Sequence, residues 1–131
     1  MDQPNVALLV IDDNLDNLEL LQAALEQRGL EILTADRPQR GLELIQERRP
    51  EIVLTDLMMP GMTGMEVLEH TKQHHPGTEV ILMTAYYSAE SAAEATRKGA
   101  CDYLEKPLSI MELRRKVKGL IKQAQDRQTH S

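Results

Sequence analysis

The chain has 131 residues, of which 41% are hydrophobic and 27% are charged. This length and balance are typical of one globular domain that buries a core, and they exclude a disordered or fibrous chain. No apolar run approaches the roughly 20 residues that span a bilayer, and the first residues lack the basic flank and apolar stretch of a signal peptide. The single cysteine, Cys101, excludes an internal disulfide framework. We therefore expect a cytoplasmic domain without a membrane partner.

Charge is distributed unevenly along the chain. Nine Lys or Arg residues and four Asp or Glu residues lie from Arg97 onward, so residues 97–131 carry about +5. The first 96 residues contain six basic and seventeen acidic side chains and carry about −11. The overall charge of −6 argues against direct nucleic-acid binding. The basic end either attracts an acidic partner or forms a solvated face of the last helix.

Five segments have the character of buried parallel strands. Four are short continuous apolar runs and the fifth is weaker, as expected where helices cover both faces of a sheet. The predicted strands are residues 8–11, 31–34, 52–55, 80–83 and 102–104.

The first two helices are predicted from an apolar face and from capping residues. Leucines at 15, 18, 21 and 25 share one face of the first helix, which is expected to end at Gly29. Asp36 is expected to cap the second helix, with Pro38 in its first turn and the helix ending before Pro50.

The other three helices have clear start and stop signals. Capping boxes that begin at Thr63 and Ser109 are expected to open the third and fifth helices. The third is expected to close at Pro76-Gly77, and the fourth to cover residues 88–98. Residues 126–131 are expected to be a polar, frayed tail.

Five strands that alternate with five helices predict an α/β fold, a doubly wound parallel sheet. Right-handed crossovers leave few topologies for such a sheet. Its ligand site is expected beyond the carboxyl ends of the strands, at the point where the strand order reverses.

Polar residues follow four of the predicted strands at that edge. They are Asp12-Asp13, Asp56, Thr84 and Lys106. Three clustered carboxylates need a counter-charge, and Mg²⁺ prefers carboxylate and phosphate oxygens. Each residue alone has an ordinary explanation: the Asp pair could cap a helix, Asp56 could be a turn residue, and the others could be plain strand and loop residues. Together they favour an aspartyl nucleophile beside a metal, with a hydroxyl donor and an ammonium group for the phosphoryl oxygens.

The segments that carry these residues resemble the motifs of response-regulator receiver domains of two-component signal transduction, and most closely those of the nitrogen-regulation type. The similarity covers residues 6–123 in the expected order. The matching segments are Val10–Asn14, Leu54–Gly64, Met83–Tyr86 and Gly99–Pro107.

The resemblance implies a flavodoxin-like fold with strand order 2-1-3-4-5 and one receiver domain over residues 1–131, with its core at 6–124 and a polar tail at 125–131. It also implies transfer of a phosphoryl group from a sensor histidine kinase to Asp56, followed by a conformational switch that regulates an output. The domain would be a signalling domain and not an enzyme with a separate substrate. The implied site residues are Asp13, Asp56 and the backbone carbonyl of Met58 as Mg²⁺ ligands, Asp12 through water, Lys106 at the phosphoryl group, and Thr84 and Tyr103 in the switch.

Two sequence features lead to further hypotheses. Met58 and Tyr86 stand at positions that, in this family, flank the path of the hydrolytic water, and neither has a carboxylate or amide to orient it. We therefore expect slow self-dephosphorylation. The fourth helix is rich in alanine, which either lets it shift at small cost or only reflects high helix propensity.

A homodimer through the fourth helix, fifth strand and fifth helix is a further hypothesis from the resemblance. Three other functions fit the sequence less well. A haloacid-dehalogenase-type phosphatase would have a second Asp two residues after its nucleophile, where this chain has Met58. A nucleotide- or flavin-binding module would have a Gly-rich loop after the first strand, where this chain has Asp12-Asp13. A receiver that is never phosphorylated usually lacks one of the site residues, and here all are present.

Overall fold

The computed structural model describes residues 6–130, and within them five strands alternate with five helices. The elements are β1 (Val6–Ile11), α1 (Leu15–Leu25), β2 (Leu30–Ala35), α2 (Pro38–Arg48), β3 (Ile52–Asp56), α3 (Gly64–His74), β4 (Glu79–Thr84), α4 (Ala89–Arg97), β5 (Asp102–Glu105) and α5 (Ile110–His130).

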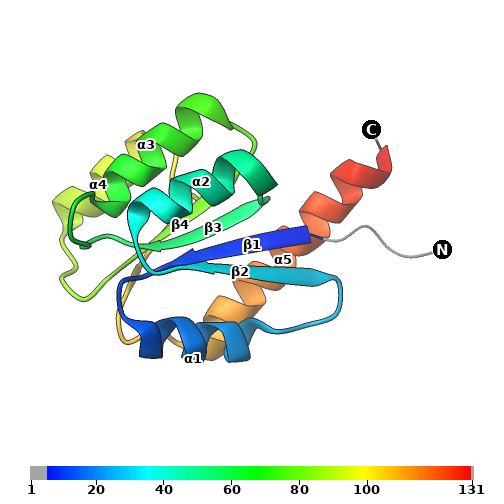
Figure 1. Ribbon diagram of the computed structural model, residues 1–131, viewed down its shortest axis with the longest axis horizontal. Coiled ribbons are helices and arrows are strands. Elements are labelled where there is room, and N and C mark those ends of the chain that lie inside the picture. The colour runs from blue at the N-terminus through cyan, green and yellow to red at the C-terminus, as the bar shows by residue number, and fades with distance from the viewer. Residues whose placement is uncertain (1–5, 131) are drawn as a thin grey trace.

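All five strands form one parallel sheet in the order β2-β1-β3-β4-β5, which confirms the predicted fold class. In Figure 1, α1 and α5 cover one face of the sheet, and α2, α3 and α4 cover the other. The chain passes from β1 to its neighbour β2 and then returns past β1 to β3, so the strand order reverses at β1. In a doubly wound sheet this reversal leaves a crevice beyond the carboxyl ends of β1 and β3.

Each face of the sheet has its own hydrophobic core. Alternate residues of β1 point to opposite faces, so Leu8 and Val10 pack with α1 and α5, whereas Leu9 and Ile11 pack with α2 and α3. The side chains of β3 and β4 are buried in the same alternating way. Burial on both faces explains why these strands are continuous apolar runs and not alternating ones.

The structure corrects two predictions about helix faces and caps. Leu15 is 62% exposed, so the buried face of α1 consists of Leu18, Leu21 and Leu25. Asp36 does not cap α2: the N-cap is Arg37, which makes no side-chain capping hydrogen bond. Pro38 at the first position supplies a fixed φ that starts the helix without a capping side chain.

The predicted tail is also corrected. α5 continues to His130, so residues 126–130 are helical and not frayed, and Ser131 lies outside the described residues. Contacts hold this end of the helix to the sheet, since Nε2 of Gln128 donates to a Glu51 carboxylate oxygen at 2.9 Å. None of the described helices is both long and apolar enough to cross a membrane.

The link between β3 and α3 brings the start of α3 against the end of β3. Gly64 donates its N–H to the carbonyl of Leu57 at 2.8 Å. The predicted capping box is present, with Thr63 Oγ1 accepting from the N–H of Glu66 at 3.2 Å. This link therefore holds the chain rigidly just beyond Asp56.

Candidate functional site

Three carboxylates meet at the carboxyl edge of the sheet. Asp12 and Asp13 follow β1, and Asp56 is the last residue of β3, which lies beside β1. One oxygen from each of the three lies within 4.8 Å of the others. Asp12 is fully buried, Asp56 is 8% exposed and Asp13 is exposed to solvent. The cluster therefore has two buried carboxylates at its inner side and one exposed carboxylate at its outer side, where an ion can enter.

The buried carboxylate of Asp12 is held by the chain that starts α1. It accepts hydrogen bonds from the N–H of Asn14 at 2.9 Å and from the Asn17 side-chain amide at 3.4 Å. The N-cap of α1 is Asn14, whose side chain accepts from the N–H of Asn17. Helix capping is therefore not the role of Asp12 or Asp13.

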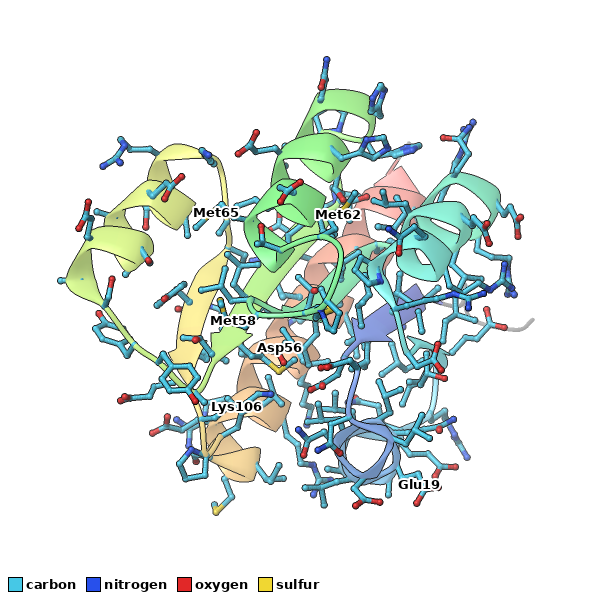
Figure 2. The ribbon with its side chains drawn as sticks, turned by 60° about the vertical axis from the view of Figure 1, so that its left-hand side comes forward. Glu19, Asp56, Met58, Met62, Met65 and Lys106 are labelled. Carbon is cyan, nitrogen blue, oxygen red and sulfur yellow. The ribbon has the colours of Figure 1, made fainter. Side chains whose placement is uncertain are left out.

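Lys106 supplies the positive charge of the site. Its Nζ lies 3.2 Å from Oδ2 of Asp12 and 3.4 Å from Oδ2 of Asp56. The backbone N–H of Lys106 donates to the carbonyl of Thr84 at 2.7 Å, which anchors the loop after β5, and the following peptide bond to Pro107 is cis. In Figure 2, Asp56, Met58 and Lys106 lie together at this edge.

Opposing effects act on the pKa of Asp56. Burial raises the pKa above its ordinary value, and the charge of Asp12 raises it further. The positive charge of Lys106 and hydrogen bonds from Lys106 and from the backbone of Met58 lower it. The net direction is upward, so the free carboxylate is more basic than an exposed aspartate.

Thr84 and the aromatic residues near it form the outer part of the site. Thr84 is fully buried, and its hydroxyl accepts from the N–H of Tyr86 at 2.9 Å. Tyr103 is half-buried, and its ring packs edge-on against Tyr87 with centroids 5.4 Å apart. The Tyr103 hydroxyl is buried without a hydrogen-bond partner among the described residues.

Met58 and Tyr86 border the site from the solvent side. Their side chains are 58% and 77% exposed. Among the described residues, neither side chain makes a polar contact with the carboxylates, whereas the backbone of Met58 hydrogen-bonds to Asp56. The side-chain environment at these positions is therefore apolar or aromatic and open to water.

A mainly apolar cavity adjoins the carboxylates. It has a volume of about 430 Å³ and lies between α1 and the loop from β5 to α5. Asp12 and Lys106 form its polar end. Neither this cavity nor Asn17 was predictable from the sequence patterns. Asn17 left only a weak signal, a polar residue one turn into a helix, and the cavity depends on how two distant segments pack. The apolar lining residues are Leu20, Leu21, Ala85, Pro107, Leu108 and Ile110.

Two curated regulatory proteins are similar to this chain in sequence. The chain is 38% identical over 113 residues to the transcriptional regulatory protein ZraR of Escherichia coli (strain K12), which covers 86% of this chain and 26% of that protein. It is 37% identical over 119 residues to the DNA-binding transcriptional regulator NtrC of the same organism, which covers 91% of this chain and 25% of that protein. The chain thus spans about a quarter of the length of these curated relatives.

Solved structures show the same fold. The receiver domain of the Francisella response regulator 1452 is 31% identical and superposes with a TM-score of 0.84, covering 92% of this chain and 99% of that one. The receiver domain of NtrX from Brucella abortus is 30% identical with a TM-score of 0.80, covering 88% and 98%. The family described as the response regulator receiver domain matches residues 8–118. The chain belongs to the response regulator receiver domain family of two-component systems.

Proposed function

We propose that this domain accepts a phosphoryl group on Asp56 from a sensor histidine kinase and changes conformation to regulate an output. One observation carries this proposal: the Lys106 ammonium reaches both Asp12 and Asp56 while three carboxylates converge beside it. A structural ion pair would need only one carboxylate. A third, exposed carboxylate is useful where a cation and an anionic group bind together.

The chemistry follows from the position of Asp56. An oxygen of its carboxylate attacks the phosphorus of a phosphohistidine, the phosphorus–nitrogen bond breaks, and the imidazole leaves. Lys106 offers a positive charge to the phosphoryl oxygens. Asp13, Asp56 and the carbonyl of Met58 would hold Mg²⁺, with Asp12 acting through water, and the ion would neutralise charge on the phosphoryl oxygens. The three-carboxylate oxygen donor set fits this hard cation.

Thr84 and Tyr103 are proposed to transmit the signal. The Thr84 hydroxyl now accepts from Tyr86, and a phosphoryl group on Asp56 would offer it a stronger, charged acceptor. Movement of Thr84 would leave space behind it. The half-buried ring of Tyr103 packs against the core on this face of the sheet and would turn into that space. The loop after β4 and the α4–β5 face would then shift together.

The apolar cavity between α1 and the β5–α5 loop supports docking of a kinase. Leu15 and Leu20 are exposed on α1 at 62% and 59%, and the cavity opens beside Lys106. Exposed apolar groups rimmed by polar residues are typical of protein contacts. A helical partner that covers this surface would present a histidine to Asp56.

The relatives' descriptions support an output in transcription, because both are named as transcription regulators. We propose that this domain acts in the cytoplasm as the regulatory part of such a system and contacts partner domains and not DNA. Homodimer formation through α4, β5 and α5 is proposed as the output step.

Intact mass after incubation with acetyl phosphate and Mg²⁺ tests the phosphorylation. We expect a gain of one phosphate that disappears with a chelator and in Asp56→Asn. Failure to gain phosphate from acetyl phosphate and from a phosphorylated kinase domain would contradict the proposal and favour an interaction platform. Steady release of phosphate from small phosphomonoesters would instead favour a phosphatase.

A further inference from the structure

Three of the four histidines of the chain lie within six residues, at the end of α3. His70 and His74 are one helical turn apart and both are exposed, and His75 caps the helix. The rings of His70 and His74 lie with their centroids 4.4 Å apart at an angle of 48°. Side chains four residues apart on a helix point in the same direction, so the two rings face the same solvent.

The spacing of the two rings matches two imidazoles on one metal ion. A nitrogen bound at about 2.1 Å places the ring centroid about 3.2 Å from the ion. Two such rings at a right angle about the ion would be about 4.5 Å apart, and at a tetrahedral angle about 5.2 Å. The observed 4.4 Å fits the right angle. Right-angled sites with nitrogen ligands are typical of Cu²⁺ and Ni²⁺.

The surroundings leave the two rings accessible to an ion. Both His70 and His74 are exposed to solvent. Lys72, which lies between the two histidines in sequence, is directed elsewhere, because its Nζ donates to the carbonyls of Pro76 and Thr78. The carboxyl end of α3 also has a partial negative charge that attracts cations.

α3 is a rigid platform for the pair. Val67, Leu68 and Thr71 are buried against the sheet, and the capping box fixes the first turn. The ring of His75 is directed elsewhere, since its Nε2 lies 3.3 Å from Oε1 of Gln46 on α2. Two imidazoles, those of His70 and His74, are thus held at chelating distance on one helix.

We propose that His70 and His74 form a second metal site, which binds a borderline transition-metal dication such as Ni²⁺ or Cu²⁺. The site differs from the carboxylate cluster in both place and chemistry. His70 lies six residues after Gly64, about 9 Å further along the helix axis from the carboxyl edge of the sheet. Mg²⁺ prefers oxygen ligands, so excess Mg²⁺ fills the carboxylate cluster and leaves the imidazoles free.

Calorimetric titration of the whole chain with Ni²⁺ in excess Mg²⁺ tests this site. We expect one ion per chain. His70→Gln and His74→Gln each remove the chelate and should weaken binding about tenfold or more. A matched control combines His70→Gln with Gln73→His: it keeps the number of histidines but puts them at adjacent positions, which do not face each other. It should bind as weakly as the single variants.

Further controls distinguish binding at His70 and His74 from binding at other side chains. His130→Gln should bind Ni²⁺ like the unchanged chain, and a paramagnetic ion should broaden amide signals of α3 before those beside Asp56. Binding by the rearranged-histidine variant as tight as that of the unchanged chain would overturn the chelate. Loss of binding in Asp56→Asn alone, or no binding in excess Mg²⁺, would also overturn it. The exchanged residues of α3, His70, Gln73 and His74, are all exposed, and thermal unfolding checks that each variant folds.

Discussion

Cys101 lies at the start of β5, at the edge of the sheet opposite to the carboxylates, and its chemistry is set by burial. Its backbone N–H donates to the carbonyl of Val80 at 2.7 Å. Burial, and next a hydrogen bond to Glu79, raise the pKa of the thiol to about 11. The protonated thiol therefore stabilises the fold fully below about pH 9, and this contribution is lost as the pH rises through about 11.

We predict that Cys101 reacts slowly with iodoacetamide at neutral pH. A rise of the pKa from 9.0 to about 11 lowers the thiolate fraction about 100-fold, so alkylation should be about 100-fold slower than in the unfolded chain. Mass spectrometry over time measures the rate. Glu79→Gln removes the acceptor charge and should speed the reaction, and a folded rate equal to the unfolded one would contradict this burial effect.

Met58 is predicted to prolong the phosphorylated state, because its exposed side chain has no group that orients a water molecule toward Asp56. Met58→Asn adds an amide there and should raise the dephosphorylation rate by about tenfold, as a positioned polar group favours attack. Loss of the phosphorylated mass with time, after removal of the phosphodonor, gives the rate. Met111→Asn is the matched control, since Met111 is 76% exposed on α5. An unchanged or slower decay in Met58→Asn would count against the hypothesis.

At the scale of elements, substitution of two helix glycines by alanine is expected to change the free energy of unfolding in opposite directions. A Cβ on Gly64, at the start of α3, would lie 2.3 Å from the carbonyl oxygen of Asp56 and 2.9 Å from Cα of Leu57. Gly64→Ala must therefore push α3 away from β3, and we expect a loss of about 1–3 kcal/mol in unfolding free energy together with slower phosphorylation.

Gly119 is the contrasting case inside α5. A Cβ there meets no atom within 4 Å. Gly119→Ala should raise the free energy of unfolding by about 0.5–1 kcal/mol, because alanine loses less backbone entropy in a helix. Urea unfolding measures both variants. If Gly64→Ala were as stable as the unchanged chain, the close contact between α3 and Asp56 would not be required.

α4 is expected to be the least firmly held helix. Only Ala95 is buried in it, whereas α3 buries five residues. Amides of α4 should exchange at least about tenfold faster than those of α3, since local opening exposes little apolar surface. Hydrogen exchange followed by NMR measures this. Exchange in α4 as slow as in β3 would mean that the helix propensity of alanine suffices and that α4 is not mobile.

For the whole molecule, the main prediction concerns assembly. β5 and α5 border a groove of about 430 Å³ that contains acidic and basic side chains, including the 3.0 Å ion pair of Lys116 with Asp102. Glu94 on α4 already pairs with Lys98 at 2.8 Å. A dimer that uses Glu94 would therefore have to replace this ion pair with one between the two copies.

We predict that a phosphoryl mimic with Mg²⁺ raises the mass in solution from monomer to dimer. Light scattering after size-exclusion chromatography measures it. Arg115→Glu, in the same groove, should weaken the dimer, and Lys122→Glu, further along α5, is the control. The same monomer mass with and without the mimic would refute dimerisation.

Much of this protein was predictable from local sequence. Apolar runs defined all five strands to within two residues at either end, because parallel strands buried on both faces require them. The acidic pair after β1, Asp56 after β3 and Lys106 after β5 could be placed at one edge, since parallel strands share the direction of their ends. The four-residue spacing of His70 and His74 is also a feature of the local sequence, but the distance between their rings is known only from the folded helix.

Tertiary packing decided the rest. Which member of the acidic pair is buried depends on the path into α1, where the amides of Asn14 and Asn17 hold Asp12 and leave Asp13 in solvent. The exposure of Leu15 depends on which residues of α1 pack into the core shared with α5, since only Leu18, Leu21 and Leu25 do so. The helical state of residues 126–130 is supported by the contact of Gln128 with Glu51, which directly precedes β3. Lys106 reaches two carboxylates only because segments about 50 and 94 residues apart fold together. Hydrophobic periodicity predicts local secondary structure, whereas these outcomes depend on how segments that are distant in sequence pack against one another.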